Sequence, residues 1–282
     1  MQPNDAPDNR AAAEDLRAEG HEFQALMRRL PPAYRDLPTA FREWTPFDVL
    51  RHLYLGDVLA VAAITDVEAF KPMIAETLAS RASGASASEH ARQHVGHLPY
   101  DELFGMYVAQ LEKLCDLVSP LSPQHRLPWA AKPMTARVFA GARQMEVWAH
   151  AQAIYDLLGI DRPPAQDRLW NIADLCVRTF GWAFAIAGEP QPGPPPRVDL
   201  VAPSGKIWTW NEPSTAGRVE GDAVEFCQVL SQTRNVADTS LRMQGEDATW
   251  WVTYGQCFAG RRSLPPPPGS RRKSDTILPL DV

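Results

Sequence analysis

The sequence lacks an excess of basic residues and any long apolar run. Its 282 residues contain 28 lysines and arginines against 34 aspartates and glutamates, so the formal net charge is -6. A surface that neutralises nucleic-acid phosphates needs a basic field, and this balance argues against a nucleic-acid partner. No apolar stretch approaches the roughly 20 residues that cross a bilayer, and the polar opening MQPNDAPDNR is unlike a signal peptide. We therefore expect a cytoplasmic protein without a membrane partner.

Cysteine is also scarce, and its spacing excludes several common sites. The four cysteines lie far apart, with no C-x-x-C pair and no zinc-ribbon spacing. Each stands in an apolar segment, where a free thiol packs as a small hydrophobic side chain. We expect four reduced, buried packing residues: Cys115, Cys176, Cys227 and Cys257.

Helical patterns dominate the first two thirds of the chain. The clearest helix start is at Trp44-Thr45-Pro46, where threonine is a good N-cap, proline suits the first helical position and Asp48 stands three residues after the cap. The small, polar residues of 79–99 predict a mobile surface segment with a short helix in it. The periodicity predicts long helices over residues 11–30, 46–65, 100–119, 135–158 and 167–188.

The composition changes at EPQPGPPP, residues 189–196, which is typical of a stiff, extended linker. After it, RVDLVAPSGKIWTWN alternates apolar and polar residues around Pro-Ser-Gly and predicts a β-hairpin. Further strands are expected near residues 216–220 and 240–244, with helices over 222–230 and 247–258. We therefore predict an α+β fold with three parts: a helical bundle over 1–188, a small α+β domain over 197–260 and an extended tail over 261–282.

Two of the predicted helices carry ionisable residues within otherwise apolar stripes. In the helix ending near 158, Glu146 and His150 are one turn apart on a stripe with Phe139 and Ala142. In the helix over 46–65, His52 lies on the apolar stripe. The stripes indicate buried faces, where a carboxylate is costly unless it is paired or bound to metal. Histidine and carboxylate together suit zinc, iron, nickel or manganese. A simple Glu–His hydrogen bond and a core histidine are the alternative reading.

The phrases WTPFDVLRHLYLGD and, about ninety residues later, RQMEVWAHAQAIYDLLG resemble the DinB-type bundle of the mycothiol-dependent maleylpyruvate isomerase superfamily. The sequence is most similar to an uncharacterised metal-binding branch of it, through PWAAKPM, DRLWNIADLCVRT, APSGKIWTW, GDAVEFCQVLSQTR and GQCFAG. The resemblance implies a four-helix bundle followed by a sterol-carrier-like α+β domain. It also implies a divalent metal, zinc before iron, nickel or manganese, held by His52, Glu146 and His150.

The resemblance implies chemistry as well. It implies a metal-dependent enzyme that uses a low-molecular-weight thiol for isomerisation or S-transfer on a small carboxylate-bearing substrate. The isomerase places a carboxylate-binding arginine in its C-terminal domain, and Arg234 is the corresponding candidate, with a surface salt bridge as the alternative. This chain departs from the branch at Ala151 and at Thr233-Arg234, which leaves the substrate open.

The remaining candidates have weaker signals. Trp129 and Trp148 flank the metal ligands in sequence and are candidates for the walls of a substrate pocket. Asp57 either orients one of the metal ligands without binding the metal itself, or is a solvated helix residue. A second metal site at His90, His94 and His97 is disfavoured, because these histidines lack an acidic partner on a buried stripe.

Three functions remain open at this point. The first is the thiol-dependent enzyme, with three protein ligands and an open metal position for water or substrate. The second is an enzyme that uses the metal as a Lewis acid or to generate hydroxide, without a thiol. The third is a non-catalytic protein that binds a metal and a small ligand. For all three the expected partner is a small molecule, and a homodimer is left open.

Overall fold

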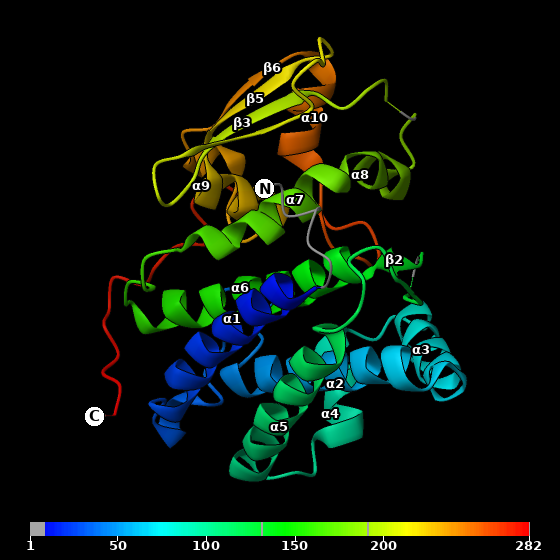
Figure 1. Cartoon of the computed structure of the whole chain (residues 1–282). Helices are drawn as coiled ribbons and strands as arrows, with labels where there is room; N and C mark the ends of the chain where they lie inside the picture. The colour runs from blue at the N-terminus through cyan, green and yellow to red at the C-terminus, as the bar shows by residue number, and fades with distance from the viewer. Residues whose placement is uncertain (1–8, 131, 191, 282) are drawn as a thin grey trace. The chain divides into compact units, whose positions relative to one another are not determined.

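The computed structural model describes residues 9–130, 132–190 and 192–281, and their contacts group into two compact units. The first contains residues 9–154 and 278–281, and the second is Tyr155–Ile277. The first is built almost entirely of helices, and the second combines helices with a four-stranded sheet (Figure 1). The fold class is therefore α+β.

Four long helices form the bundle of the first unit. Fully buried side chains fill its interior, among them Phe23 and Tyr107, whose rings meet edge to face at 5.5 Å between centroids. The small helices and the two-stranded hairpin β1–β2 complete the unit. The elements are α1 (Arg10–Arg28), η2 (Pro32–Tyr34), α2 (Pro46–Thr65), α3 (Val67–Ala82), α4 (Ala87–Val95), α5 (Tyr100–Val118), β1 (Arg126–Leu127), β2 (Met134–Thr135) and α6 (Ala136–Leu158), whose last residues belong to the second unit.

The start of α2 is confirmed in detail, and a buried carboxylate holds it. Thr45 Oγ1 accepts a hydrogen bond from the Asp48 amide at 3.1 Å, and Asp48 Oδ2 accepts one from the Thr45 amide at 3.1 Å. The Asp48 side chain is fully buried and also accepts from Arg92 Nε at 2.7 Å and Arg51 Nη1 at 3.2 Å. Burial works to raise the pKa of Asp48, but the hydrogen bonds from Arg92 and Thr45 hold it below its ordinary value.

Helix α3 is not predicted by the sequence pattern. It buries only Phe70 and Thr77 and contains Pro72, so its apolar residues form no clear stripe. Its N-cap is Asp66, which accepts a hydrogen bond from the backbone amide of Ala69 at 3.0 Å. The short helix expected within 79–99 is confirmed as α4, which begins with its own capping box.

The sheet of the second unit has the strand order β4-β3-β5-β6. The predicted hairpin is confirmed as the antiparallel pair β3–β4, in which Val198 lies opposite Trp210 and Leu200 opposite Trp208. Strand β5 runs parallel to β3 and antiparallel to β6. The elements are β3 (Arg197–Val201), β4 (Ile207–Trp210), β5 (Arg218–Asp222), α9 (Ala223–Leu230), η4 (Val236–Asp238), β6 (Arg242–Gln244) and α10 (Glu246–Tyr254).

The predicted helix over 167–188 is divided. It consists of η3 (Asp167–Leu169), α7 (Trp170–Arg178) and α8 (Phe180–Ala187). Thr179 lies at the break, and its hydroxyl donates to the carbonyls of Leu175 and Cys176 at 2.9 Å, a contact that often bends a helix.

The structural division of the chain differs from the boundary at 188 that composition suggested. Helices α7 and α8 pack within the sheet-containing unit, where Phe180 meets Trp251 at 5.2 Å and Phe184 stacks on Trp250 at 4.2 Å between ring centroids. The proline-rich segment therefore follows two helices of the second unit instead of separating the units. Residues 255–281 contain no helix or strand.

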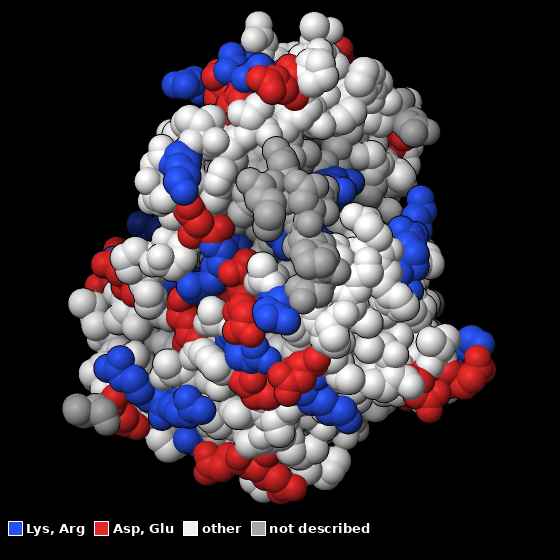
Figure 2. All heavy atoms as spheres, in the orientation of Figure 1, with Lys and Arg blue, Asp and Glu red and all other residues white. Residues whose placement is uncertain are grey.

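Two further observations concern the surface and the helices. Over the described residues, no helix combines the length and hydropathy that a membrane span needs. On the face shown in Figure 2, acidic and basic side chains are interspersed among the residues drawn in colour, as the modest net charge leads one to expect.

Replacing Asp48 should destabilise the fold far more than replacing the equivalent acid of α4. Asp48→Ala removes a capping-box carboxylate and leaves the Arg92 and Arg51 guanidinium groups without their buried partner, so we expect a loss of about 3 kcal/mol. Glu89→Ala removes the same capping position at an exposed site, so its effect should be only a small part of that. Thermal unfolding followed by circular dichroism compares the two, and equal shifts in melting temperature would contradict this account.

Candidate metal centre

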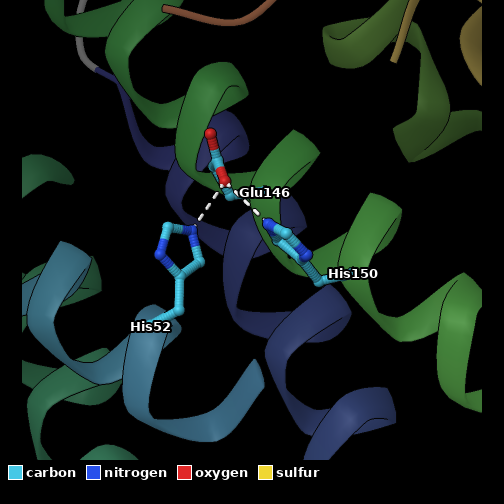
Figure 3. Close-up of side chains that lie close together, drawn as sticks. All are labelled: His52, Glu146 and His150. Carbon is cyan, nitrogen blue, oxygen red and sulfur yellow. Dashed lines mark hydrogen bonds and ion pairs between the residues drawn. The ribbon is translucent and has the colours of Figure 1, made fainter. Parts of the chain in front are cut away.

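Three donor side chains from two helices meet in the first unit. His52 comes from α2, and Glu146 and His150 come from successive turns of α6 (Figure 3). Glu146 Oε2 lies 3.2 Å from His52 Nε2 and 3.3 Å from His150 Nε2. One donor atom from each residue lies within 4.8 Å of the other two. The structure thus brings together the three ligands predicted from the stripes.

These distances suit a tetrahedral metal site. Zinc lies about 2.0–2.2 Å from histidine nitrogen and carboxylate oxygen, and two such ligands in a tetrahedron are therefore about 3.3 Å apart. The two nitrogen–oxygen distances match that separation, and they also suit hydrogen bonds from the imidazoles to Glu146. The donor set fits a divalent metal in its chemistry, and the two distances from Glu146 Oε2 to the histidine nitrogens suit the spacing of metal ligands.

The protonation states favour ligand binding. Burial lowers the pKa of His52 to about 4, with a smaller contribution from the charge of His150, although Glu146 works in the opposite direction. Burial would raise the pKa of Glu146, but hydrogen bonds from His150 and His52 keep it well below its ordinary value. At neutral pH, His52 therefore keeps a lone pair available on its ring, and Glu146 carries its charge.

Aromatic rings fix the orientation of both histidines. Trp44 stacks parallel to His150, with an interplanar angle of 2° and 5.2 Å between centroids, and meets His52 edge-on at 5.1 Å. Phe41 contacts His150 edge-on at 5.1 Å. Between these two aromatics, Arg42 and Glu43 have φ angles of 51° and 59°, in the left-handed region that L residues seldom occupy. This strained turn brings Phe41 and Trp44 to the same imidazole.

The ligands lie on the accessible side of α6, which corrects the expectation that their stripe is the buried face. The Glu146 side chain is 25% exposed and that of His150 is 11% exposed. Most of the helix is buried on all sides, and its half-exposed positions recur mainly at intervals of three and four: Val138, Ala142, Glu146, Ala149, His150 and Leu157. The apolar pattern was misleading because the opposite faces of α6 are buried as well. The Glu146 and His150 side chains are therefore partly open to solvent on this side.

Asp57 forms an ion pair with Arg143, whereas the sequence suggested either a contact that orients a metal ligand or a solvated position. It is buried and pairs with Arg143, whose Nε and Nη2 lie 3.1 and 2.9 Å from Asp57 Oδ1. Sequence reasoning missed Arg143, although a basic residue three positions before Glu146 in a largely apolar helix was a usable signal. The role of Asp57 in orienting a ligand stays a prediction.

The predicted pocket tryptophans lie in other surroundings. Trp129 packs against Phe70 at 6.1 Å and Phe139 at 5.1 Å between centroids. Trp148 is 3% exposed and belongs to the core. The rings that contact the histidines are those of Trp44 and Phe41, so the substrate-binding role of Trp129 and Trp148 stays a prediction without a contact to support it.

Arg234 makes the salt bridge that was the alternative to a substrate contact. Its Nη1 and Nη2 each lie 2.7 Å from one oxygen of Asp156, whose side chain is only 5% exposed. Nη1 also donates to the carbonyl oxygen of Thr233 at 2.8 Å. A substrate carboxylate would have to compete with Asp156 for this guanidinium, and the predicted substrate contact stays untested.

The other histidines and the cysteines form no comparable site. His90 and His94 have rings 4.3 Å apart, and His94 Nε2 lies 3.1 Å from Glu76 Oε1. His97 is exposed. In the described parts of the chain, His52, Glu146 and His150 form the only group of three metal-ligand residues this close together. The four cysteines are buried thiols outside any disulfide, as predicted.

The fold has a known counterpart. The crystal structure of the mycothiol-dependent maleylpyruvate isomerase matches with a TM-score of 0.51 and 13% sequence identity, over 81% of this chain and 91% of that one. A variant of the isomerase with one histidine replaced by alanine matches equally well. This likeness defines the class of fold, a DinB-like helical bundle with an α+β unit.

Sequence comparison gives the family. A family model described as the mycothiol maleylpyruvate isomerase N-terminal domain matches residues 16–155. Uncharacterised proteins of two Mycobacterium tuberculosis strains, H37Rv and CDC 1551, are each 34% identical over 258 residues, which is 92% of this chain and 96% of theirs. The chain belongs to the mycothiol-dependent maleylpyruvate isomerase superfamily.

His150→Ala should abolish stoichiometric metal binding. Protein prepared without chelator should contain about one divalent metal per chain by elemental analysis, because three donors with two imidazoles form a complete protein ligand set. The variant loses one donor and the ring that stacks on Trp44. His94→Ala, which removes a histidine from a surface pair, should keep the metal. Unchanged metal content in His150→Ala would rule out this ligand set.

Proposed function

We propose that this protein is a metal-dependent enzyme that acts on a small carboxylate-bearing substrate with the help of a low-molecular-weight thiol. The reaction class is isomerisation or thiol S-transfer, and zinc is the proposed metal, with iron, nickel and manganese as alternatives. The observation that carries the proposal is the meeting of His52, Glu146 and His150 on an accessible face, with spacings that suit a metal. Membership of a superfamily that includes a mycothiol-dependent isomerase supports the thiol.

When bound, a divalent cation at these donors would supply Lewis acidity and would favour the deprotonated form of a thiol at neutral pH. Glu146 contributes one negative charge to the site, which lowers the net positive charge offered to a reactant. His52 and His150 contribute imidazole nitrogens, and Trp44 fixes the planes of both rings. The chain therefore presents three oriented donors with access from one side.

The cysteines of the chain are poorly suited to act as nucleophiles in a competing covalent mechanism. The four cysteines are buried, and burial raises the pKa of Cys115 to about 12, so its thiol is protonated at neutral pH. The burial of Cys176 likewise raises the pKa of that thiol. A reactive sulfur is therefore better supplied by a small thiol than by the protein itself, and the protein supplies orientation.

A cobalt(II)-substituted sample tests the thiol. Adding mycothiol or free cysteine should change the visible absorption of the cobalt protein, and the S-methylated forms of the same compounds should not. His52→Ala should abolish the response because it removes one of the three donors. A cobalt spectrum unchanged by every thiol, yet shifted by a small carboxylate, would contradict the thiol and favour Lewis-acid or metal-hydroxide chemistry.

A further inference from the structure

A buried ion pair lies between the two helices that supply the metal donors. Arg143 of α6 and Asp57 of α2 have side chains that are 5% and 1% exposed. Arg143 Nε and Nη2 donate to Asp57 Oδ1 at 3.1 and 2.9 Å, and Nη2 also approaches the carbonyl oxygen of Leu53 at 3.5 Å. One guanidinium therefore links α6 to both a side chain and the backbone of α2.

The pair lies next to the donors in both helices. Arg143 comes one turn before Glu146 on α6, and Leu53 immediately follows His52 on α2. Because His52 and the other two donors are on different helices, the distances among the three donor atoms depend on how α2 and α6 are held together. The guanidinium fixes that arrangement beside the site.

The absence of a side chain at Gly56 leaves room for the Arg143 guanidinium. A Cβ atom at this position would lie 2.6 Å from Arg143 Nη2 and 2.8 Å from Nη1. Since Arg143 is held by Asp57 and the Leu53 carbonyl, even a methyl group at position 56 would have to displace it. The backbone of α2 is thus fitted closely to the ion pair.

The pair is poorly suited to a purely stabilising role. Asp57 accepts both hydrogen bonds on Oδ1, and its buried Oδ2 has no hydrogen-bond partner in the described chain. A buried ion pair often contributes no more stability than well-packed apolar residues of similar volume, and specifying one arrangement is its better-attested use. The charge of Arg143 also lies close enough to disfavour a positive charge on His52.

We propose that Arg143 and Asp57 are positioning residues, which set the separation of His52 from Glu146 and His150 and thereby the affinity and geometry of the metal site. This inference rests on the proposed metal binding. It goes beyond naming the ligands, because it says that a contact between α2 and α6 sets the distances among them.

The experiment replaces the pair by apolar residues of similar size and uses a second buried pair as control. The double variant Arg143→Met/Asp57→Leu removes both charges together. The control, Arg234→Met/Asp156→Leu, does the same to the ion pair of the second unit. Gly56→Ala keeps every charge and displaces the guanidinium. Zinc affinity is measured by chelator competition, geometry by the cobalt(II) visible spectrum, and folding by the melting temperature without metal.

The variant without the Arg143–Asp57 pair should fold and bind zinc about 10–100-fold more weakly, with an altered cobalt spectrum, because outer partners of metal ligands have effects of this size. Gly56→Ala should weaken binding about tenfold. The control double variant should keep wild-type zinc affinity and spectrum whatever its melting temperature.

Wild-type affinity and an unchanged cobalt spectrum in a folded variant without the pair would overturn the proposal. If that variant does not fold, Gly56→Ala decides, and wild-type zinc affinity with an unchanged spectrum there overturns it equally. Failure of the proposed function has a different signature, because wild-type protein itself would then bind no zinc.

Discussion

The burial of Asp48 is the constraint on which the rest of the first unit depends. A carboxylate without solvent contact is tolerated only because backbone, hydroxyl and guanidinium donors surround it. Those donors come from the turn before α2, from α2 itself and from α4, so a single side chain fixes where the helix begins. Trp44 immediately precedes the N-cap residue Thr45, and His52 comes one turn after Asp48. The position of His52 on α2 is thus determined by interactions at the start of the helix.

Local signals in the sequence predict much of this arrangement. Thr45, Pro46 and Asp48 mark the start of α2 because capping depends on residues adjacent in the chain. The same holds for Glu146 and His150, whose spacing of four places them together on any helix. With His52 they could be assigned before any distance was known, helped by the resemblance to a family.

The features that could not be predicted depend on contacts between distant segments. The accessible side of α6 is decided by what packs on its other faces, and buried residues, polar ones among them, occur on most of the helix. The partner of Arg234 lies 78 positions away at Asp156. The sequence places Trp44 at the start of a helix. Its stacking on His150 could not be predicted, because it depends on a turn with two residues at positive φ. Helices α7 and α8 have ordinary patterns, and contacts with distant segments place them in the second unit, such as those of Phe180 and Phe184 of α8 with α10.

The burial of α6 bears on how proteins of this architecture diversify. In a helix packed on nearly all sides, most substitutions disturb the core and are removed by selection for stability. The positions that can change at little cost are the partly exposed ones, and Val138, Ala142 and Ala149 share the stripe of Glu146 and His150. Tolerance to mutation is thus concentrated beside the group formed by His52, Glu146 and His150. Single substitutions there can alter the surroundings of these three side chains while the helical scaffold remains the same.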